Sequence, residues 1–159
     1  MLVLYAGYPA AFAALEAVRA EWPEPATAAE GRTSRAGERR RGLALCRRVY
    51  GPVLPRLLGR VRRLHPAIAR WMIEEGYGRV LSRPGMDARE RGLVTVAALA
   101  ALGWEPQLVS HLLGAARLGA TPAQRRAAWS TGVARARDRE TRAASARAWR
   151  RAASRARAV

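Results

Sequence analysis

The stretch RPGMDARERGLVTVAALAALGWEPQLVSHLLGAARLGATPAQ, residues 83–124, decides the fold that the sequence predicts. It contains two apolar segments, separated by the break Gly-Trp-Glu-Pro at residues 103–106. Between Gly92 and Leu102 the only polar side chain is that of Thr95, so the first segment predicts a helix that is buried on most of its circumference. The second segment has apolar residues at helical spacing and predicts a second core helix.

Local signals mark where these helices begin. Asp87 and Glu90 have the spacing of a capping box, in which each side chain accepts a hydrogen bond from the other residue's backbone. Thr121 and Gln124 repeat that spacing and predict the start of a third helix. We therefore expect two core helices that meet at a tight corner around Trp104.

The motifs in this stretch resemble those of a known family. RPGMD, Arg91, LVTVAALAALG, QLVSH and GAARLGATP are similar, in composition and spacing, to the core of the carboxymuconolactone decarboxylase family, which includes the alkylhydroperoxidase D-like proteins. The resemblance implies an all-α bundle of about six helices. It also implies a homo-oligomer, either a trimer or a hexamer.

The resemblance places the catalytic positions of the peroxidase branch on this sequence. That branch has a Glu, a Cys-x-x-Cys pair and a His, and the corresponding residues here are Gly92, Trp104, Gln107 and His111. Only the histidine is kept. Because cysteine peroxidase chemistry requires a thiolate, we expect no thiol peroxidase activity.

The decarboxylase branch, which generally lacks the two cysteines, implies a different site. Its reaction is the cofactor-free decarboxylation of a muconolactone, which needs a cation for the substrate carboxylates and a proton donor. His111 is the candidate catalytic residue, and Arg91 and Arg117 are the candidate cations. Gln107, one turn before His111, is a candidate to orient the imidazole, and Trp104 is a candidate for substrate contact. In the alternative interpretation, His111 and Trp104 are ordinary core residues.

Cofactor and metal sites are not expected. The chain has two histidines and one cysteine, far apart in sequence, and these do not have the spacing of metal ligands. Cys46 lies among apolar residues at helical spacing, which predicts a buried structural thiol. A single cysteine, no apolar run long enough to span a membrane and no basic segment at the start favour a cytoplasmic location.

The charge of the chain is strongly positive and unevenly distributed. The net charge is +17 over 159 residues, and all 29 basic residues are arginine. Residues 125–159 contain 11 of these arginines against Asp138 and Glu140. Such a segment attracts polyanions, so nonspecific binding of nucleic acid through it is an alternative function for a catalytically silent oligomeric scaffold.

The domain organisation follows from breaks in the helical pattern. We predict one helical domain over residues 1–133, with an N-terminal helix over 1–22 that is kinked near Gly7, a linker over 23–37 and a core over 38–133. Within the core, Gly51-Pro52 divides two helices, and a further helix starts at Pro66. One long Arg- and Ala-rich helix is predicted over 122–156, and its part beyond residue 133 is the predicted tail, 134–159, which is expected to dock shallowly or stay exposed.

The opening segment LYAGYPAAFAALEAV resembles the helix that follows the G-A-T-P segment in this family. A circular permutation would place it against the helices at 92–103 and 106–118, with Tyr5, Tyr8 or Phe12 near His111. The alternative is an arm that completes a neighbouring subunit. Both hypotheses make the first helix part of the core.

Overall fold

The computed structural model describes residues 1–22 and 34–156, and all of their regular structure is helical. The predicted all-α class is confirmed. The elements are α1 (Val3–Glu21), α2 (Arg35–Tyr50), the short 3₁₀ helix η1 (Gly51–Val53), α3 (Leu54–Leu64), α4 (Pro66–Trp71), the π-helix η2 (Met72–Val80), α5 (Ala88–Leu102), α6 (Glu105–Arg117), α7 (Pro122–Ala134) and α8 (Arg139–Ala156). Within the described ranges, no helix is both long and apolar enough to cross a membrane.

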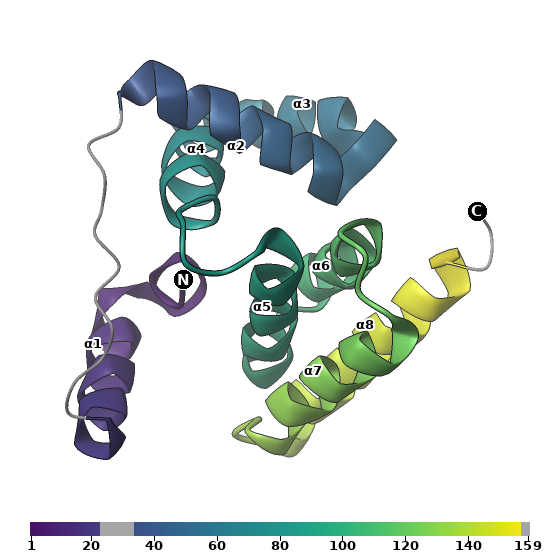
Figure 1. Cartoon of the computed structure of the whole chain (residues 1–159). Coiled ribbons are helices and arrows are strands. Elements are labelled where there is room, and N and C mark those ends of the chain that lie inside the picture. The colour runs from purple at the N-terminus through teal and green to yellow at the C-terminus, as the bar shows by residue number, and fades with distance from the viewer. Residues whose placement is uncertain (23–33, 157–159) are drawn as a thin grey trace.

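The helices form two adjoining groups, with α5 and α6 in the middle of the molecule (Figure 1). Helices α5, α6, α7 and α8 enclose one apolar cluster, in which large residues of α5 and α6 such as Leu99, Leu108 and Leu112 meet small residues of α8. Helices α2 and α3 and the π-helix η2 enclose the second, which contains Leu45, Cys46 and larger aromatic residues. Helix α2 also contacts α6, so the two clusters meet where α6 carries His111.

The predicted helix starts in the central stretch are confirmed. Asp87 caps α5, and its capping box with Glu90 is complete in both directions. Thr121 and Gln124 form the corresponding box at the start of α7. These caps satisfy backbone N–H groups that have no partner inside the helix, which is why the local sequence determines these starts.

The start of α2 differs from the prediction. Residues 23–33 of the predicted linker lie outside the described residues, but α2 begins at Arg35 rather than at residue 38. The Ser34 hydroxyl accepts a hydrogen bond from Gly37 N at 3.2 Å and so caps the helix earlier than its apolar pattern indicates.

The segment after Pro66 is not one regular helix. It changes from α4 to the π-helix η2 at Met72, which the sequence pattern did not indicate. Helix α2 lies directly against η2, because Gly42 and Gly78 leave room for the two backbones to touch. A Cβ atom on Gly42 would overlap the Ile73 carbonyl, and one on Gly78 would overlap the Glu38 carbonyl.

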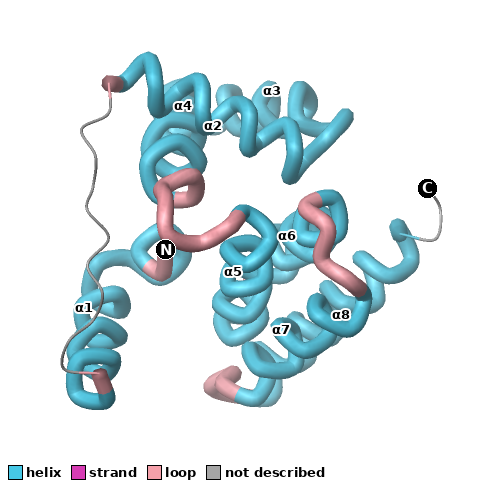
Figure 2. Tube along the Cα trace, viewed as in Figure 1, coloured by secondary structure: helices cyan, strands magenta, loops and turns pink. Residues whose placement is uncertain are grey.

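The prediction of one long C-terminal helix is wrong. Helix α7 ends at Ala134, and α8 starts after Asp138, whose carboxylate accepts a hydrogen bond from Thr141 N at 2.7 Å. The loops in Figure 2 show this turn between two helices that lie side by side. Gly132 is needed for packing, because a Cβ atom there would overlap the Ala97 carbonyl of α5.

The expectation that the tail docks shallowly or stays exposed is also wrong for residues 139–156. Helix α8 packs along α6 and α5, with Ala148 and Ser145 fully buried. The Ser145 hydroxyl donates a 2.6 Å hydrogen bond to the Ala100 carbonyl of α5. Alanine and serine side chains are short enough to let helix axes approach closely, so a helix without large apolar residues is still part of the core.

Helix α1, in contrast to α8, is largely exposed. The predicted kink is confirmed at Gly7, where φ is 78° and ψ is 177°. Before the kink, Tyr5 reaches α5 and His111, as one part of the permutation hypothesis predicted. After the kink, Tyr8 and Phe12 are 69% and 59% exposed, so most of the helix does not pack against α5 or α6 of its own chain. The permutation itself, and the alternative of an arm on a neighbouring subunit, stay predictions.

Candidate functional site

His111 lies at the junction of the two apolar clusters. Helix α6 carries it, and its side chain is buried, with only 9% of the residue exposed. Two tyrosine rings approach it edge-on: the centroid of Tyr5 is 6.0 Å away and that of Tyr50 is 6.3 Å away. The imidazole is thus enclosed by side chains from α1, α2 and α6, segments far apart in sequence.

This environment determines the protonation state of His111. Burial lowers the pKa of His111 from 6.5 to about 4, because a charged imidazolium would lose its hydration there. The side chain is therefore neutral at pH 7. A neutral imidazole carries one N–H donor and one acceptor nitrogen, so it can take part in proton transfer in either direction.

Tyrosine hydroxyls around the histidine form two short hydrogen-bonded chains. Tyr77 of η2 donates to the Tyr50 hydroxyl at 2.7 Å. Tyr5 donates to the Thr95 hydroxyl at 3.4 Å, and Thr95 donates to the Arg91 carbonyl at 2.9 Å. Burial raises the pKa of all three tyrosines, so these phenols stay protonated, and Tyr5 and Tyr77 act as hydrogen-bond donors.

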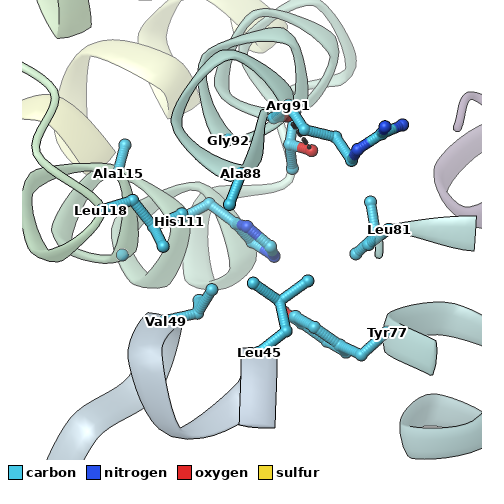
Figure 3. Close-up of a pocket in the computed structure, with 12 residues that line it drawn as sticks. Leu45, Val49, Tyr77, Leu81, Ala88, Arg91, Gly92, His111, Ala115 and Leu118 are labelled. Atoms are coloured by element: carbon cyan, nitrogen blue, oxygen red, sulfur yellow. Dashed lines mark hydrogen bonds between the residues drawn. The ribbon is translucent and has the colours of Figure 1, made fainter. Parts of the chain in front are cut away.

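A small cavity of about 20 Å³ adjoins His111. Figure 3 shows the imidazole pointing into it, with Leu45 and Tyr77 opposite and with Arg91 and Leu81 to one side. That volume accommodates about one water molecule or one carboxylate oxygen. The lining comes from α2, η2, α5 and α6: Leu45, Val49, Tyr77, Leu81, Ala88, Arg91, Gly92, Thr95, His111, Gly114, Ala115 and Leu118.

Arg91 contributes a charged group to this cavity. It is only 4% exposed, and its Nη2 donates to the carbonyls of Arg83 and Met86 at 2.8 and 3.0 Å. Burial and the neighbouring Arg83 guanidinium lower the pKa of Arg91, although an arginine stays charged at neutral pH. Its Nε atom is buried and has no hydrogen-bond partner in the described part of the chain. Because unpaired buried donors are rare and costly, this atom is suited to an acceptor oxygen from a ligand.

The other three predicted site residues do not line this cavity. Arg117 is exposed, and its Nη1 donates to the Val49 carbonyl at 2.9 Å, which ties α6 to the end of α2. Gln107 is exposed one turn before His111, and Trp104 is 52% exposed at the corner between α5 and α6. The structure therefore brings together His111 and Arg91, and places Arg117, Gln107 and Trp104 elsewhere.

Several residues of the site had no signal in the sequence. Tyr50 and Tyr77 come from α2 and η2, and each fits an ordinary core position in its own segment. Only the packing of α2 between η2 and α6 brings them to His111. Gly92, which occupies the Glu position of the peroxidase branch in the resemblance, does line the cavity.

The structure also shows the surroundings of Cys46 and of the side chains that could bind a metal. Cys46 is fully buried, as predicted, and burial raises the pKa of its thiol to about 12. The thiolate fraction at neutral pH is then very small, which does not suit a peroxide-reducing cysteine. No group of three or more His, Cys, Asp or Glu side chains with the geometry of a metal site occurs among residues 1–22 and 34–156.

The region that contains His111 and Arg91 matches a known protein family. Residues 66–154, more than half of the chain, match the carboxymuconolactone decarboxylase family. The matched range starts at α4, includes Arg91 and His111, and extends through most of α8. No curated protein matches the chain. The chain belongs to the carboxymuconolactone decarboxylase family.

Proposed function

We propose that this protein binds a small anionic carboxylate compound beside His111 and exchanges a proton with it, without a resident cofactor. One observation carries the proposal: a neutral, buried histidine lines the same cavity as a buried arginine whose Nε has no hydrogen-bond partner among the described residues. Arg91 supplies a positive charge and a hydrogen bond for a carboxylate oxygen, and His111 supplies the group that titrates.

Ligand binding would change the basicity of His111. An anion close to an imidazole stabilises its protonated form, so a carboxylate in the cavity raises the pKa of His111 from its low value. Binding of the anion and uptake of a proton by His111 are therefore coupled. The proton reaches the site together with the substrate that uses it.

Decarboxylation is the reaction in this family that such a site fits. The bond between the substrate carbon and its carboxylate breaks, CO₂ leaves, and the electron pair stays on the carbon, delocalised into a conjugated carbonyl of the substrate. The His111 imidazolium then donates its proton to that carbon and becomes neutral again. This sequence needs no oxidant, reductant or metal ion.

The test is whether anion binding takes up a proton through His111. Malonate or benzoate is titrated calorimetrically into the protein at pH 6.5 in two cationic buffers of different ionisation enthalpy. We expect proton uptake by the wild type and none by His111→Asn. His65→Asn is the matched control, because His65 is exposed and only caps α4 through Nδ1, a role that Asn also fills.

Two results would contradict the proposal. One is binding by the wild type with no proton uptake, and the other is the same uptake in His111→Asn. We also expect no thiol-dependent peroxide reduction, and the buried, high-pKa thiol predicts that Cys46→Ala changes nothing in a peroxide-consumption assay. Peroxide turnover that disappears in Cys46→Ala would overturn that part.

A second candidate function is an oligomeric scaffold that binds polyanions. It is favoured by α8, which carries Arg142, Arg150 and Arg155 in exposed positions. Replacing these three residues by glutamine should weaken binding to mixed-sequence DNA and lower its salt dependence. Anion-coupled proton uptake that is unchanged in this triple variant would show that the two functions are separate. The trimer or hexamer and the cytoplasmic location implied earlier stay predictions.

A further inference from the structure

A second, larger hollow opens on the surface next to the His111 cavity. It lies between α2 and the connection from η2 to α5, and its volume is about 270 Å³, enough for a small organic molecule. We refer to it as the arginine cleft. It is lined by Arg41, Ala44, Leu45, Arg48, Leu81, Ser82, Arg83, Met86 and Ala88.

The charge of the arginine cleft is entirely positive. Its lining includes Arg41, Arg48 and Arg83 and no acidic residue. None of these three guanidinium groups forms an ion pair with a carboxylate of the described residues. Clustered cations without counter-charges repel one another, and an anionic ligand relieves that repulsion.

Backbone contacts hold the Arg41 side chain and the loop that carries Arg83. Arg41 Nη2 donates to the Gly78 carbonyl at 3.3 Å, which anchors that side chain on η2. The Arg83 carbonyl accepts a 2.8 Å hydrogen bond from Arg91, which fixes the loop that carries the Arg83 side chain. Arg48 projects from α2 in an exposed position.

Apart from Ser82, the rest of the lining is apolar. Leu45, Leu81 and Met86 form most of it, so a ligand with a hydrophobic body would bury that body against them. The hollow between α2 and α4 offers a contrast. It is larger, about 410 Å³, but its three arginines lie beside Glu74 and Glu75, and Arg39 pairs with Glu74 at 3.6 Å. Uncompensated positive charge beside an apolar surface thus distinguishes the arginine cleft.

The arginine cleft and the His111 cavity share a wall. Leu45, Leu81 and Ala88 line both. The His111 cavity is too small for more than one ligand oxygen, whereas the arginine cleft has space for the body of a substrate. Movement of the Leu45 or Leu81 side chain would join the two spaces.

We infer that the arginine cleft binds a small organic anion with an apolar body. The anionic group pairs with Arg48 and Arg83, and the body lies against Leu45, Leu81 and Met86. That the same molecule reaches His111 rests on the proposed function; the anion binding itself does not.

The experiment compares four probes by calorimetric titration of the full chain in a cationic buffer. Benzoate and phenyl phosphate combine an anion with an apolar body, benzamide has the body without the charge, and inorganic phosphate has the charge without the body. We expect benzoate and phenyl phosphate to bind and to compete with each other, and benzamide and inorganic phosphate to bind at least about tenfold more weakly.

Variants then locate the site. Arg48→Ala and Arg83→Ala should each weaken benzoate binding by about tenfold or more, while leaving the thermal midpoint unchanged because both side chains are exposed. Arg47→Ala and Arg62→Ala are matched controls: each removes one exposed arginine outside the cleft and should leave the affinity within about twofold.

Each outcome decides for or against the assignment. Benzoate affinity that is unchanged in Arg48→Ala and Arg83→Ala overturns it, and so does an equal loss in Arg47→Ala, which would indicate a general charge effect. Suppose that Arg48→Ala and Arg83→Ala lose benzoate binding, while His111→Asn takes up the same number of protons as the wild type. That result would support the arginine cleft and contradict the proposed function. Benzoate binding that is lost in His111→Asn but unchanged in Arg48→Ala and Arg83→Ala would support the proposed function and contradict the arginine cleft.

Discussion

The burial of the two terminal helices is the opposite of what their compositions suggest. Helix α1 is rich in large apolar residues, yet Tyr8, Phe12 and Leu15 are each at least 59% exposed. Helix α8 consists mainly of alanine and arginine, yet Thr141, Ser145, Ala148 and Ala152 are buried between it and the bundle. Residue hydrophobicity alone therefore did not indicate which helix belongs to the core.

The difference follows from geometry. Helix α8 packs against α6 and α5 through buried positions that run from Thr141 to Ala152, and its short side chains let the backbones approach closely enough for the Ser145 hydroxyl to donate to the Ala100 carbonyl. Its arginines point outward, and Arg147 and Arg151 both pair with Glu105 of α6, at 2.9 and 2.8 Å. Helix α1 reaches α5 and His111 through Tyr5, before its kink at Gly7, whereas the large side chains of Tyr8, Phe12 and Leu15 after the kink stay exposed.

The largest expected effect comes from removing each helix in turn. Deleting residues 139–159 should abolish cooperative unfolding, because it exposes Leu108, Leu112 and their neighbours on α5 and α6. Deleting residues 1–22 should leave a cooperative transition with a lower midpoint, since α1 contributes mainly Tyr5. Thermal and urea melts followed by circular dichroism provide the measurement. If the chain folded without α8, or failed to fold without α1, the conclusion that α8 belongs to the core and most of α1 does not would be wrong.

The next effect concerns pH. The pKa of His111 is about 4 in the folded chain against an ordinary 6.5, so only the unfolded chain takes up this proton between those values. Stability is therefore complete above about pH 6.5, falls as the pH is lowered, and has lost about 3 kcal/mol from this group by pH 4. Urea melts at several pH values should show this slope in the wild type and in His65→Asn, and not in His111→Asn.

Deleting helix α1 should also change the pH dependence of stability. Deleting residues 1–22 removes Tyr5 from the imidazole, which admits water and moves the pKa of His111 back toward 6.5. The slope between pH 6.5 and 4.5 should then decrease. An undiminished slope would mean that Tyr50 and the cavity wall alone account for the burial of the histidine.

A smaller effect is expected from enlarging α8. Ala148 is fully buried against α5 and α6, so Ala148→Leu should lower the free energy of unfolding by about 1–3 kcal/mol through overpacking. Ala143 is exposed on the same helix, and Ala143→Leu is the matched control, expected to change stability by no more than about 0.5 kcal/mol. Equal effects of the two substitutions would show that α8 is not packed as described.

The smallest effect is expected from α1. Phe12 is 59% exposed, so Phe12→Ser should change the free energy of unfolding of the isolated chain by no more than about 0.5 kcal/mol. Melts at two protein concentrations, with size-exclusion chromatography, provide the measurement. A larger loss that depends on protein concentration would mean that α1 covers a second copy of the chain.

At the site, residues with a local or family signal could be predicted and residues from distant segments could not. His111 and Arg91 belong to the motifs that carried the resemblance, and they line one cavity. Gln107 and Arg117 also lie in these motifs, and they were predicted to orient the imidazole and to supply a cation, but both are exposed on α6. Tyr50, Tyr77 and the arginine cleft arise where α2 packs on η2 and α6, and no short-range pattern encodes that contact.

The sequence by itself determined the all-α class, the family resemblance, the capped starts of α5 and α7, the kink at Gly7 and the burial of Cys46. Each of these depends on hydrogen bonds and side-chain periodicity within a few residues of the chain. Only the tertiary structure decided that α8 is core and most of α1 is not, that Gly42 and Gly132 are close-contact sites, and which side chains surround His111. These features depend on how closely helices distant in sequence approach one another, and that distance is determined by the packing of the whole bundle.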